Sequence, residues 1–251
     1  MVRPILEGIN ITKRFGGLVA VDNFSFFLDK NELVGLIGPN GAGKTTLFNC
    51  ITKIEKPTSG VIKLEGKNIT HLKPHEVARI GIARTFQIPR YFPSLTVLQN
   101  VALGCISLGY SMSRAYETAK KMLKYVHLDE KIDLKASSLN MQEKRLLEIA
   151  KALSLRPKVL LLDEVAAGLI PSEIAEIRKV INEIREEFDL SIMWVEHVMD
   201  VIMKAADRVI VMNEGKKIAE GPPVEVARNK KVIEVYLGER YKEVTTKRAE
   251  D

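Results

Sequence analysis

Residues 38–46 read GPNGAGKTT and directly follow the apolar run LVGLI. They fit the pattern G-x-x-x-x-G-K-[ST] in a strand–loop–helix context. Such glycines let successive backbone N–H groups point at one anion, the lysine reaches terminal phosphates, and the hydroxyl can bind Mg²⁺. A turn that needed only a tight backbone would not explain the lysine. The spacing predicts a phosphate loop for a nucleotide, formed by Gly38, Pro39, Asn40, Gly41, Ala42, Gly43, Lys44, Thr45 and Thr46.

An acidic pair ends a second apolar run, VLLLDE, at residues 159–164. Four apolar residues in succession predict a strand that is buried on both faces. Asp163 at the strand end would hold Mg²⁺ through water, and Glu164 would lie next to the γ-phosphate. Two acids after an apolar run are also a common way for a strand to end. The phosphate loop earlier in the chain favours the functional interpretation.

Length and composition suit one large α/β domain. The chain has 251 residues, of which 46% are hydrophobic, enough for a buried core. We find neither a signal peptide nor about 18 consecutive apolar residues, so we expect a cytoplasmic protein. Cys50 and Cys105 lack metal-ligand spacing and are interpreted as buried thiols. The net charge of +6 favours acidic partners only weakly, because basic and acidic residues are interspersed.

The arrangement of predicted elements indicates a mainly parallel sheet with an insertion. Residues 5–32 predict two outer strands, and 60–70 predict another pair. From about Pro89 to Ser154 the pattern is helical. After it, the apolar runs KVLLLDE, SIMWVEH and RVIVMNEG alternate with helical patterns, as βαβ units do.

Several further pieces occur in a fixed order: Phe15 in KRFGG, Gln87 in ARTFQ, the stretch SLNMQEKRLLEIAKAL and His197 in MWVEH. With the two motifs above, this series resembles the ATP-binding subunit of an ABC transporter over nearly the whole chain. The resemblance implies an α/β fold: a P-loop NTPase (RecA-like) core, an N-terminal antiparallel β subdomain and an inserted α-helical subdomain. It further implies a single ABC ATPase domain over 1–251, with the β subdomain and P-loop core in 1–88 and 156–237, the helical subdomain in 89–155 and a charged tail in 238–251.

The same resemblance implies roles for single residues in binding and hydrolysing ATP. Phe15 would stack on adenine, whose face suits an aromatic ring. Glu164 would be the general base, and His197 would contact the γ-phosphate. Gln87 would touch Mg²⁺ and the attacking water, so that the metal site comprises Thr45, Gln87 and Asp163. Taken singly, a phenylalanine usually lies in the core, a glutamine usually lies on the surface, and a histidine at a strand end can have a purely structural hydrogen bond. The occurrence of all of them in this order favours a role in ATP binding and hydrolysis.

Three longer sequence motifs point to one branch of the family. GIARTFQIPRYFPSLTVLQNVALG, AAGLIP and VIEVYLGE are similar to the ATP-binding subunits that drive branched-chain amino-acid import. ATP-binding subunits for the import of urea or amides, or for the export of lipopolysaccharide, share much of this sequence. The branch implies membrane-spanning permease partners and a peripheral location on the cytoplasmic face of the cell membrane. One alternative is a soluble ABC-type ATPase that acts on ribosomes or DNA; such proteins usually have two modules or a coiled-coil insertion, and because this chain has neither, we expect no nucleic-acid partner. A second alternative is a regulatory subunit that binds ATP without turnover, which the degenerate signature favours and the intact Glu164 and His197 disfavour.

The family signature, normally LSGGQ, is degenerate here. It is occupied by Leu139, Asn140, Met141, Gln142 and Glu143. The residues themselves predict a helix start with Asn140 as N-cap and Glu143 completing a capping box. In the family this segment caps the ATP held by a second subunit. Gln142 should obstruct that approach where glycine is usual, and Glu143 adds negative charge.

A second departure falls at the same composite site. Ile170 stands where the family has Asp or Asn, and Val165 replaces a usual proline. The residues that hold this chain's own ATP, in contrast, agree with the family. We therefore expect a heterodimer in which the partner cassette supplies an intact signature, while the opposite site hydrolyses ATP poorly.

Overall fold

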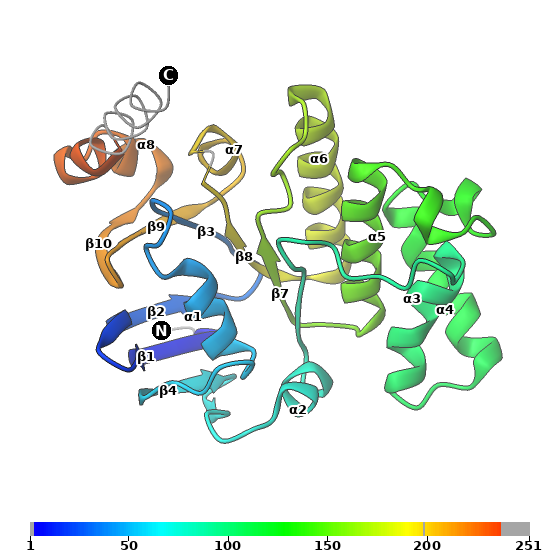
Figure 1. Ribbon diagram of the computed structural model, residues 1–251, viewed down its shortest axis with the longest axis horizontal. Coiled ribbons are helices and arrows are strands. Elements are labelled where there is room, and N and C mark those ends of the chain that lie inside the picture. Colours follow the sequence, from blue (N-terminus) through cyan, green and yellow to red (C-terminus); the bar gives the residue numbers. More distant parts are fainter. Residues whose placement is uncertain (1–2, 198, 237–251) are drawn as a thin grey trace. The chain divides into compact units, whose positions relative to one another are not determined.

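The computed structural model describes residues 3–197 and 199–236 of the chain (Figure 1). The chain divides into two compact units. The first comprises residues 1–71 and 193–251, and the second comprises 72–192. The chain passes from the second unit back to the first within strand β8 (Ser191–Val195).

An antiparallel sheet in the first unit contains the N-terminal strands. Its order is β2-β1-β4-β5, with Leu6 of β1 opposite Leu28 of β2 and Leu64 of β4. Alternating burial along β2 and β4 gives this sheet one apolar face. Two outer strands and a later strand pair are therefore confirmed. The four strands are β1 (Leu6–Phe15), β2 (Leu18–Leu28), β4 (Ser59–Leu64) and β5 (Lys67–Asn68).

The remaining strands of the first unit carry the phosphate loop. β3 is buried at all five positions because LVGLI is apolar throughout. It pairs in parallel with β9, and β9 pairs antiparallel with β10. The elements are β3 (Leu33–Ile37), α1 (Lys44–Ile51), α7 (Met199–Met203), β9 (Arg208–Asn213), β10 (Lys216–Gly221) and α8 (Pro223–Ala227).

Three helices that pack against one another dominate the second unit (Figure 1). They are α3 (Val97–Ser107), α4 (Met112–Tyr125) and α5 (Met141–Ser154), with short 3₁₀ turns η1 (Asp129–Lys131) and η2 (Ala136–Ser138) between the last two. Each helix begins at a polar N-cap whose side chain accepts a backbone N–H, namely Thr96, Ser111 and Asn140. The predicted helical insertion is confirmed.

The second unit also contains a parallel strand pair. β6 (Ile82–Arg84) pairs with β7 (Val159–Asp163), which is buried throughout. Helix α2 (Pro74–Arg79) precedes β6, and α6 (Pro171–Phe188) follows β7. The apolar run that ends in the acidic pair is thus the predicted strand. This pair places the chemistry-bearing residues of the unit at adjacent strand ends.

The α/β fold with an antiparallel β subdomain and a helical insertion is confirmed. Cys50 and Cys105 are buried free thiols, as predicted. The charged tail at 238–251 lies outside the described residues. Within the described ranges, none of the helices combines the length and apolar character needed to cross a membrane.

Candidate functional site

The phosphate loop in the first unit is a strand–loop–helix turn, as its sequence predicts. Gly43 is the residue before α1, and its φ of 106° lies in the left-handed region that favours glycine. A Cβ added to Gly43 would stand 2.2 Å from the carbonyl oxygen of Ala20, and one added to Gly38 would stand 2.0 Å from that of Met212. The loop therefore has this shape only because glycine occupies both positions.

The loop is arranged to accept an anion. Lys44 is 5% exposed, and its ammonium group donates to the carbonyl oxygens of Gly38 at 2.5 Å and Pro39 at 2.9 Å. The N-cap of α1 forms no side-chain capping bond, while Gly41 and Thr45 are exposed. Helix N–H groups and a lysine at the start of an eight-residue helix suit a phosphate chain. The residues present thus fit a nucleoside triphosphate, and the Thr45 hydroxyl is a suitable ligand for Mg²⁺.

Phe15, the predicted adenine contact, ends β1 and is 44% exposed. The ammonium group of Lys13 lies 4.6 Å from the centroid of its ring. A half-exposed ring beside a cation offers a flat face for a purine. Its exposure also argues against a core residue.

His197, the predicted γ-phosphate contact, lies two residues after the end of β8 and is exposed. Its neighbour Glu196 is buried, and a carboxylate oxygen of Glu196 accepts the indole N–H of Trp194 at 3.1 Å. The buried Trp–Glu pair fixes the chain where the strand ends. His197 therefore directly follows a residue whose side chain is buried and hydrogen-bonded.

Gln87 and Glu164 meet in the second unit, although 77 residues separate them in sequence. The Gln87 amide Nε2 donates to the Glu164 carboxylate Oε2 at 2.7 Å. Glu164 is 7% exposed and has a φ of 50°, an uncommon value for a residue other than glycine. Such strain is typical of functional positions, and here it turns the chain sharply at the end of β7. A carboxylate in contact with an amide can orient and polarise a water molecule.

Asp163 is paired with Arg84, a residue that our sequence reasoning missed. An Arg84 guanidinium nitrogen and an Asp163 carboxylate oxygen are 2.7 Å apart, and the side chains are only 5% and 1% exposed. Burial of two charges requires such a partner. The signal was a charged residue within the apolar strand IAR, but its partner is 79 residues away. The ion pair fixes Asp163, whose carboxylate suits Mg²⁺.

Two further buried charges on α5, Arg145 and Glu148, contact the segment that carries Gln87. Both are 4% exposed. Burial raises the pKa of the Glu148 carboxyl to about 7, although backbone N–H groups of Arg90 and Phe86 and the charges of Lys151 and Arg145 act in the opposite direction. The sequence signal was a pair of charges on the apolar face of an amphipathic helix.

The degenerate signature forms the start of α5. Asn140 is the N-cap, and its side-chain oxygen accepts the backbone N–H of Glu143 at 2.9 Å. The Glu143 carboxylate in turn accepts the backbone N–H of Asn140 at 2.9 Å. The predicted capping box is confirmed. Glu143 also pairs with Lys131. Burial opposes ionisation of Glu143, but these bonds lower its pKa below the ordinary value.

The other residues near the signature differ in their surroundings. Leu139 is buried and Met141 is 51% exposed. The Gln142 amide donates to Glu176 of α6. Ile170, which replaces the usual Asp or Asn, precedes α6, is 60% exposed and offers no polar side-chain group.

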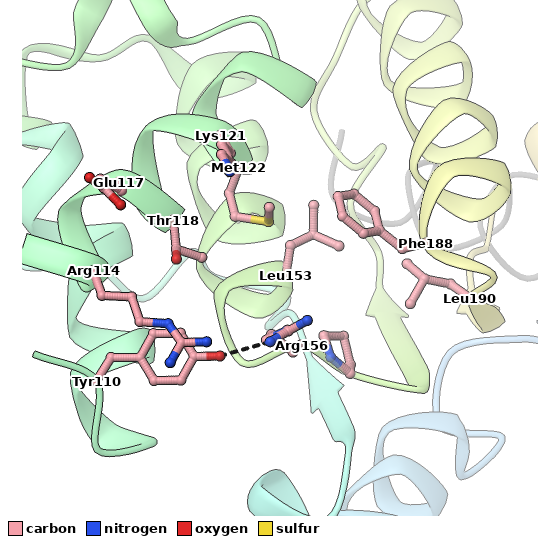
Figure 2. A pocket seen from close by; sticks show the side chains of 11 residues that line it. Tyr110, Arg114, Glu117, Thr118, Lys121, Met122, Leu153, Arg156, Phe188 and Leu190 are labelled. Atoms are coloured by element: carbon pink, nitrogen blue, oxygen red, sulfur yellow. Dashed lines mark hydrogen bonds between the residues drawn. The ribbon is translucent and has the colours of Figure 1, made fainter.

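Figure 2 shows a cavity of about 500 Å³ elsewhere in the second unit. None of the predicted site residues lines it. Arg156 donates to the Tyr110 hydroxyl at 2.9 Å, and the guanidinium of Arg114 lies 4.3 Å from the Tyr110 ring centroid. These contacts tie the segment before α4 to the end of α5. Two of the basic residues that line the cavity, Arg114 and Arg156, therefore contact other side chains of the protein.

Comparison with known proteins agrees with these features. The family model described as "ABC transporter" matches residues 21–167, and the model described as "Branched-chain amino acid ATP-binding cassette transporter" matches 216–242. The high-affinity branched-chain amino acid transport ATP-binding protein BraF of Pseudomonas aeruginosa is 38% identical. That match covers 95% of this chain and 100% of BraF.

The solved structures that resemble this chain include two ATP-binding cassettes. An ATP-binding cassette of an ABC transporter in its ADP conformation is 34% identical with a TM-score of 0.86, over 94% of this chain and 99% of that one. A dimeric cassette in a post-hydrolysis state with ADP and Pi is 26% identical with a TM-score of 0.78, over 87% and 98% respectively. The chain therefore belongs to the ATP-binding proteins of ABC transporters, in the branched-chain amino acid transport branch, and is an ATPase whose hydrolysis is coupled to transport.

Proposed function

We propose that this chain energises the import of branched-chain amino acids by a transporter in which it pairs with a second, different ATP-binding subunit. Membrane-spanning permease subunits would form the path for the solute, and this chain would bind them peripherally at the cytoplasmic face of the membrane. The names of its relatives support the solute class. The dimeric relative supports a paired arrangement of cassettes.

The proposed reaction is hydrolysis of ATP that is held by the phosphate loop. Lys44 and the backbone of residues 38–46 would bind the phosphates, and Phe15 would stack on adenine. Glu164 would accept a proton from the attacking water while Gln87 orients that water, and His197 would contact the γ-phosphate. Thr45, Gln87 and Asp163 would hold Mg²⁺, which neutralises charge on the phosphates when bound. Catalysis of this kind depends chiefly on positioning and charge stabilisation.

The observation that carries this proposal is the contact between Gln87 and Glu164. It brings together the two residues that must handle the same water molecule. The carboxylate is held in a buried turn after β7, and the amide comes from the segment that follows β6. ATP binding would close the two cassettes, and hydrolysis would let them reopen, so that movement near Gln87 reaches the permease subunits.

The asymmetry of the pair follows from the signature. Gln142 and Glu143 replace glycine and glutamine, and Ile170 replaces a polar residue. Loss of a donor that stabilises developing charge lowers a rate by about 10²-fold or more. This chain's own phosphate loop would therefore serve the active site, completed by the partner's signature. The site opposite would bind ATP and turn it over slowly.

Uptake into vesicles tests the proposal. The chain is co-expressed with its partner subunits, reconstituted, and supplied with ATP on the side that it faces and radioactive leucine on the other. We expect leucine accumulation that requires ATP and is lost with Lys44→Ala. Uptake of urea or an amide instead of leucine would contradict the solute class, and ATP hydrolysis without transport would contradict the transport role.

A further inference from the structure

We infer that Arg145 and Glu148 of α5 act as positioning residues for hydrolysis by holding the backbone of the segment 86–90, here called the Gln87 loop, and thereby placing Gln87 against Glu164. The inference rests on the proposed role of Gln87. It assigns a function to two buried charges that neither bind the nucleotide nor occupy the signature positions.

A single oxygen atom of Glu148 forms hydrogen bonds to both ends of the Gln87 loop. Its Oε1 accepts the backbone N–H of Phe86 at 3.0 Å and that of Arg90 at 3.2 Å. The other carboxylate oxygen is buried and has no hydrogen-bond partner among the described residues. An acceptor that receives two backbone donors four residues apart fixes the path of the chain between them.

Arg145 binds the carbonyl oxygens of the two peptide groups that flank Gln87. Its Nη1 donates to the carbonyl oxygen of Gln87 at 2.5 Å and to that of Phe86 at 3.3 Å. Its Nη2 lies 3.5 Å from the carbonyl oxygen of Ala167, three residues after Glu164. The planar guanidinium offers several donors in a fixed fork, which suits such a shared contact. Arg145 therefore reaches the segments that carry both members of the Gln87–Glu164 pair.

The contacts of the two side chains favour positioning over simple stabilisation. Residues three apart lie on one face of a helix, so Arg145 and Glu148 present their groups to the same loop. These hydrogen bonds go to the main chain of the loop, and they fix its course whatever side chains it carries. Two buried charges stabilise a fold no better than apolar residues of the same size would. Their benefit is the placement of Gln87.

The Phe86 ring makes additional contacts with two arginines, Arg84 before the loop and Arg90 at its end. The guanidinium groups of Arg84 and Arg90 lie 4.8 Å and 4.4 Å from its centroid. The loop is therefore held at Phe86 by backbone bonds and by ring contacts. Because Asn140 is the N-cap of α5, the helix that carries the degenerate signature is also the helix that holds the Gln87 loop.

Steady-state ATP hydrolysis by the assembled complex tests the inference. Glu148→Ala removes the acceptor, and Arg145→Lys keeps the charge but loses the fork. We expect each to lower kcat about tenfold or more, since small misplacements of reacting groups are costly, and to change KM for ATP less than twofold. Glu148→Gln keeps an oxygen at the Oε1 position and should restore most of the kcat lost in Glu148→Ala.

A control separates positioning from general destabilisation. Leu123 is fully buried in α4 of the same unit and forms no side-chain hydrogen bond to the loop. Leu123→Ala should lower the melting temperature while kcat stays within twofold of wild type. An equal loss of kcat in Leu123→Ala would overturn the inference, because any weakening of the unit would then suffice.

Hydrogen exchange of the purified chain gives a readout that does not need hydrolysis. The amides of Phe86 and Arg90 should exchange at least tenfold faster in Glu148→Ala than in wild type and at nearly the wild-type rate in Glu148→Gln. Unchanged protection of both amides, or wild-type kcat in Glu148→Ala, would overturn the inference. A wild-type complex that hydrolyses no ATP would instead contradict the proposed function, and exchange would still test the contacts.

Discussion

The side-chain amide of Gln87 donates a hydrogen bond of 2.7 Å to the carboxylate of Glu164. The two residues follow strands β6 and β7, which are parallel neighbours, so the sheet brings the segments that carry them close together. The carboxylate is buried and the amide is its partner. This relationship gives the first prediction on catalysis.

Glu164→Gln should keep ATP binding and lower hydrolysis by about 10²-fold or more, the usual contribution of a general base. The change removes proton acceptance while the shape of the side chain is kept. The matched control is Glu186→Gln, an exposed change on α6. Phosphate release by the complex and binding of a fluorescent nucleotide are the two measurements. Wild-type turnover in Glu164→Gln would remove Glu164 from this role.

The Arg84–Asp163 ion pair predicts a large effect on stability. Arg84→Met leaves the Asp163 carboxylate buried without its cation, which should lower the free energy of unfolding by about 3 kcal/mol. Adding Asp163→Asn should recover most of that loss, because the uncompensated charge is gone. Urea unfolding followed by circular dichroism measures both.

Arg79→Met is the control for that experiment, since Arg79 is exposed at the end of α2. It should change the free energy of unfolding by less than about 0.5 kcal/mol. An Arg84→Met variant as stable as Arg79→Met would show that the pair contributes little to the fold.

Glu148 predicts a pH dependence of stability with a definite sign. Its pKa of about 7 in the folded chain exceeds the ordinary value of 4.5, because burial disfavours the charged form. Between these values the folded chain binds more protons than the unfolded chain, so this residue's contribution falls as pH rises. The difference amounts to about 3 kcal/mol between pH 4.5 and pH 7 and above. Glu148→Gln should remove that slope and be more stable than wild type at pH 8; identical pH profiles would contradict the assignment.

Restoring the signature should raise turnover at the partner's nucleotide. The variant combines Asn140→Ser, Met141→Gly, Gln142→Gly and Glu143→Gln. It removes the side chain at Gln142 and the negative charge at Glu143, while serine can still cap α5. ATP hydrolysis is measured in a complex whose other site is silenced by Glu164→Gln in this chain. Turnover no higher than that of the unrestored complex would count against the asymmetric pair.

The phosphate loop and the capping box were predictable because their determinants are close together in sequence. Gly43, Lys44 and Thr45 act through their order alone, and Asn140 caps a helix three residues away. The continuous apolar runs 33–37 and 159–162 likewise predict strands buried on both faces. Local patterns therefore define most of the fold.

The contacts that hold the acidic pair were not predictable from one sequence. Arg84 meets Asp163 across 79 residues, and Glu148 meets Phe86 across 62. A charged residue in an apolar strand or on the apolar face of a helix indicates that a partner exists. It does not say which residue that partner is, because tertiary packing decides which segments meet.

The most direct test of the asymmetric pair is the oligomeric state of purified Glu164→Gln protein by light scattering, with and without ATP. Slow hydrolysis in this variant would preserve any ATP-bound dimer. We predict a monomer that binds ATP and dimerises only when a cassette with an intact signature is added. A stable ATP-dependent homodimer with two nucleotides would contradict this, because it would mean that the segment from Leu139 to Glu143 still caps a phosphate.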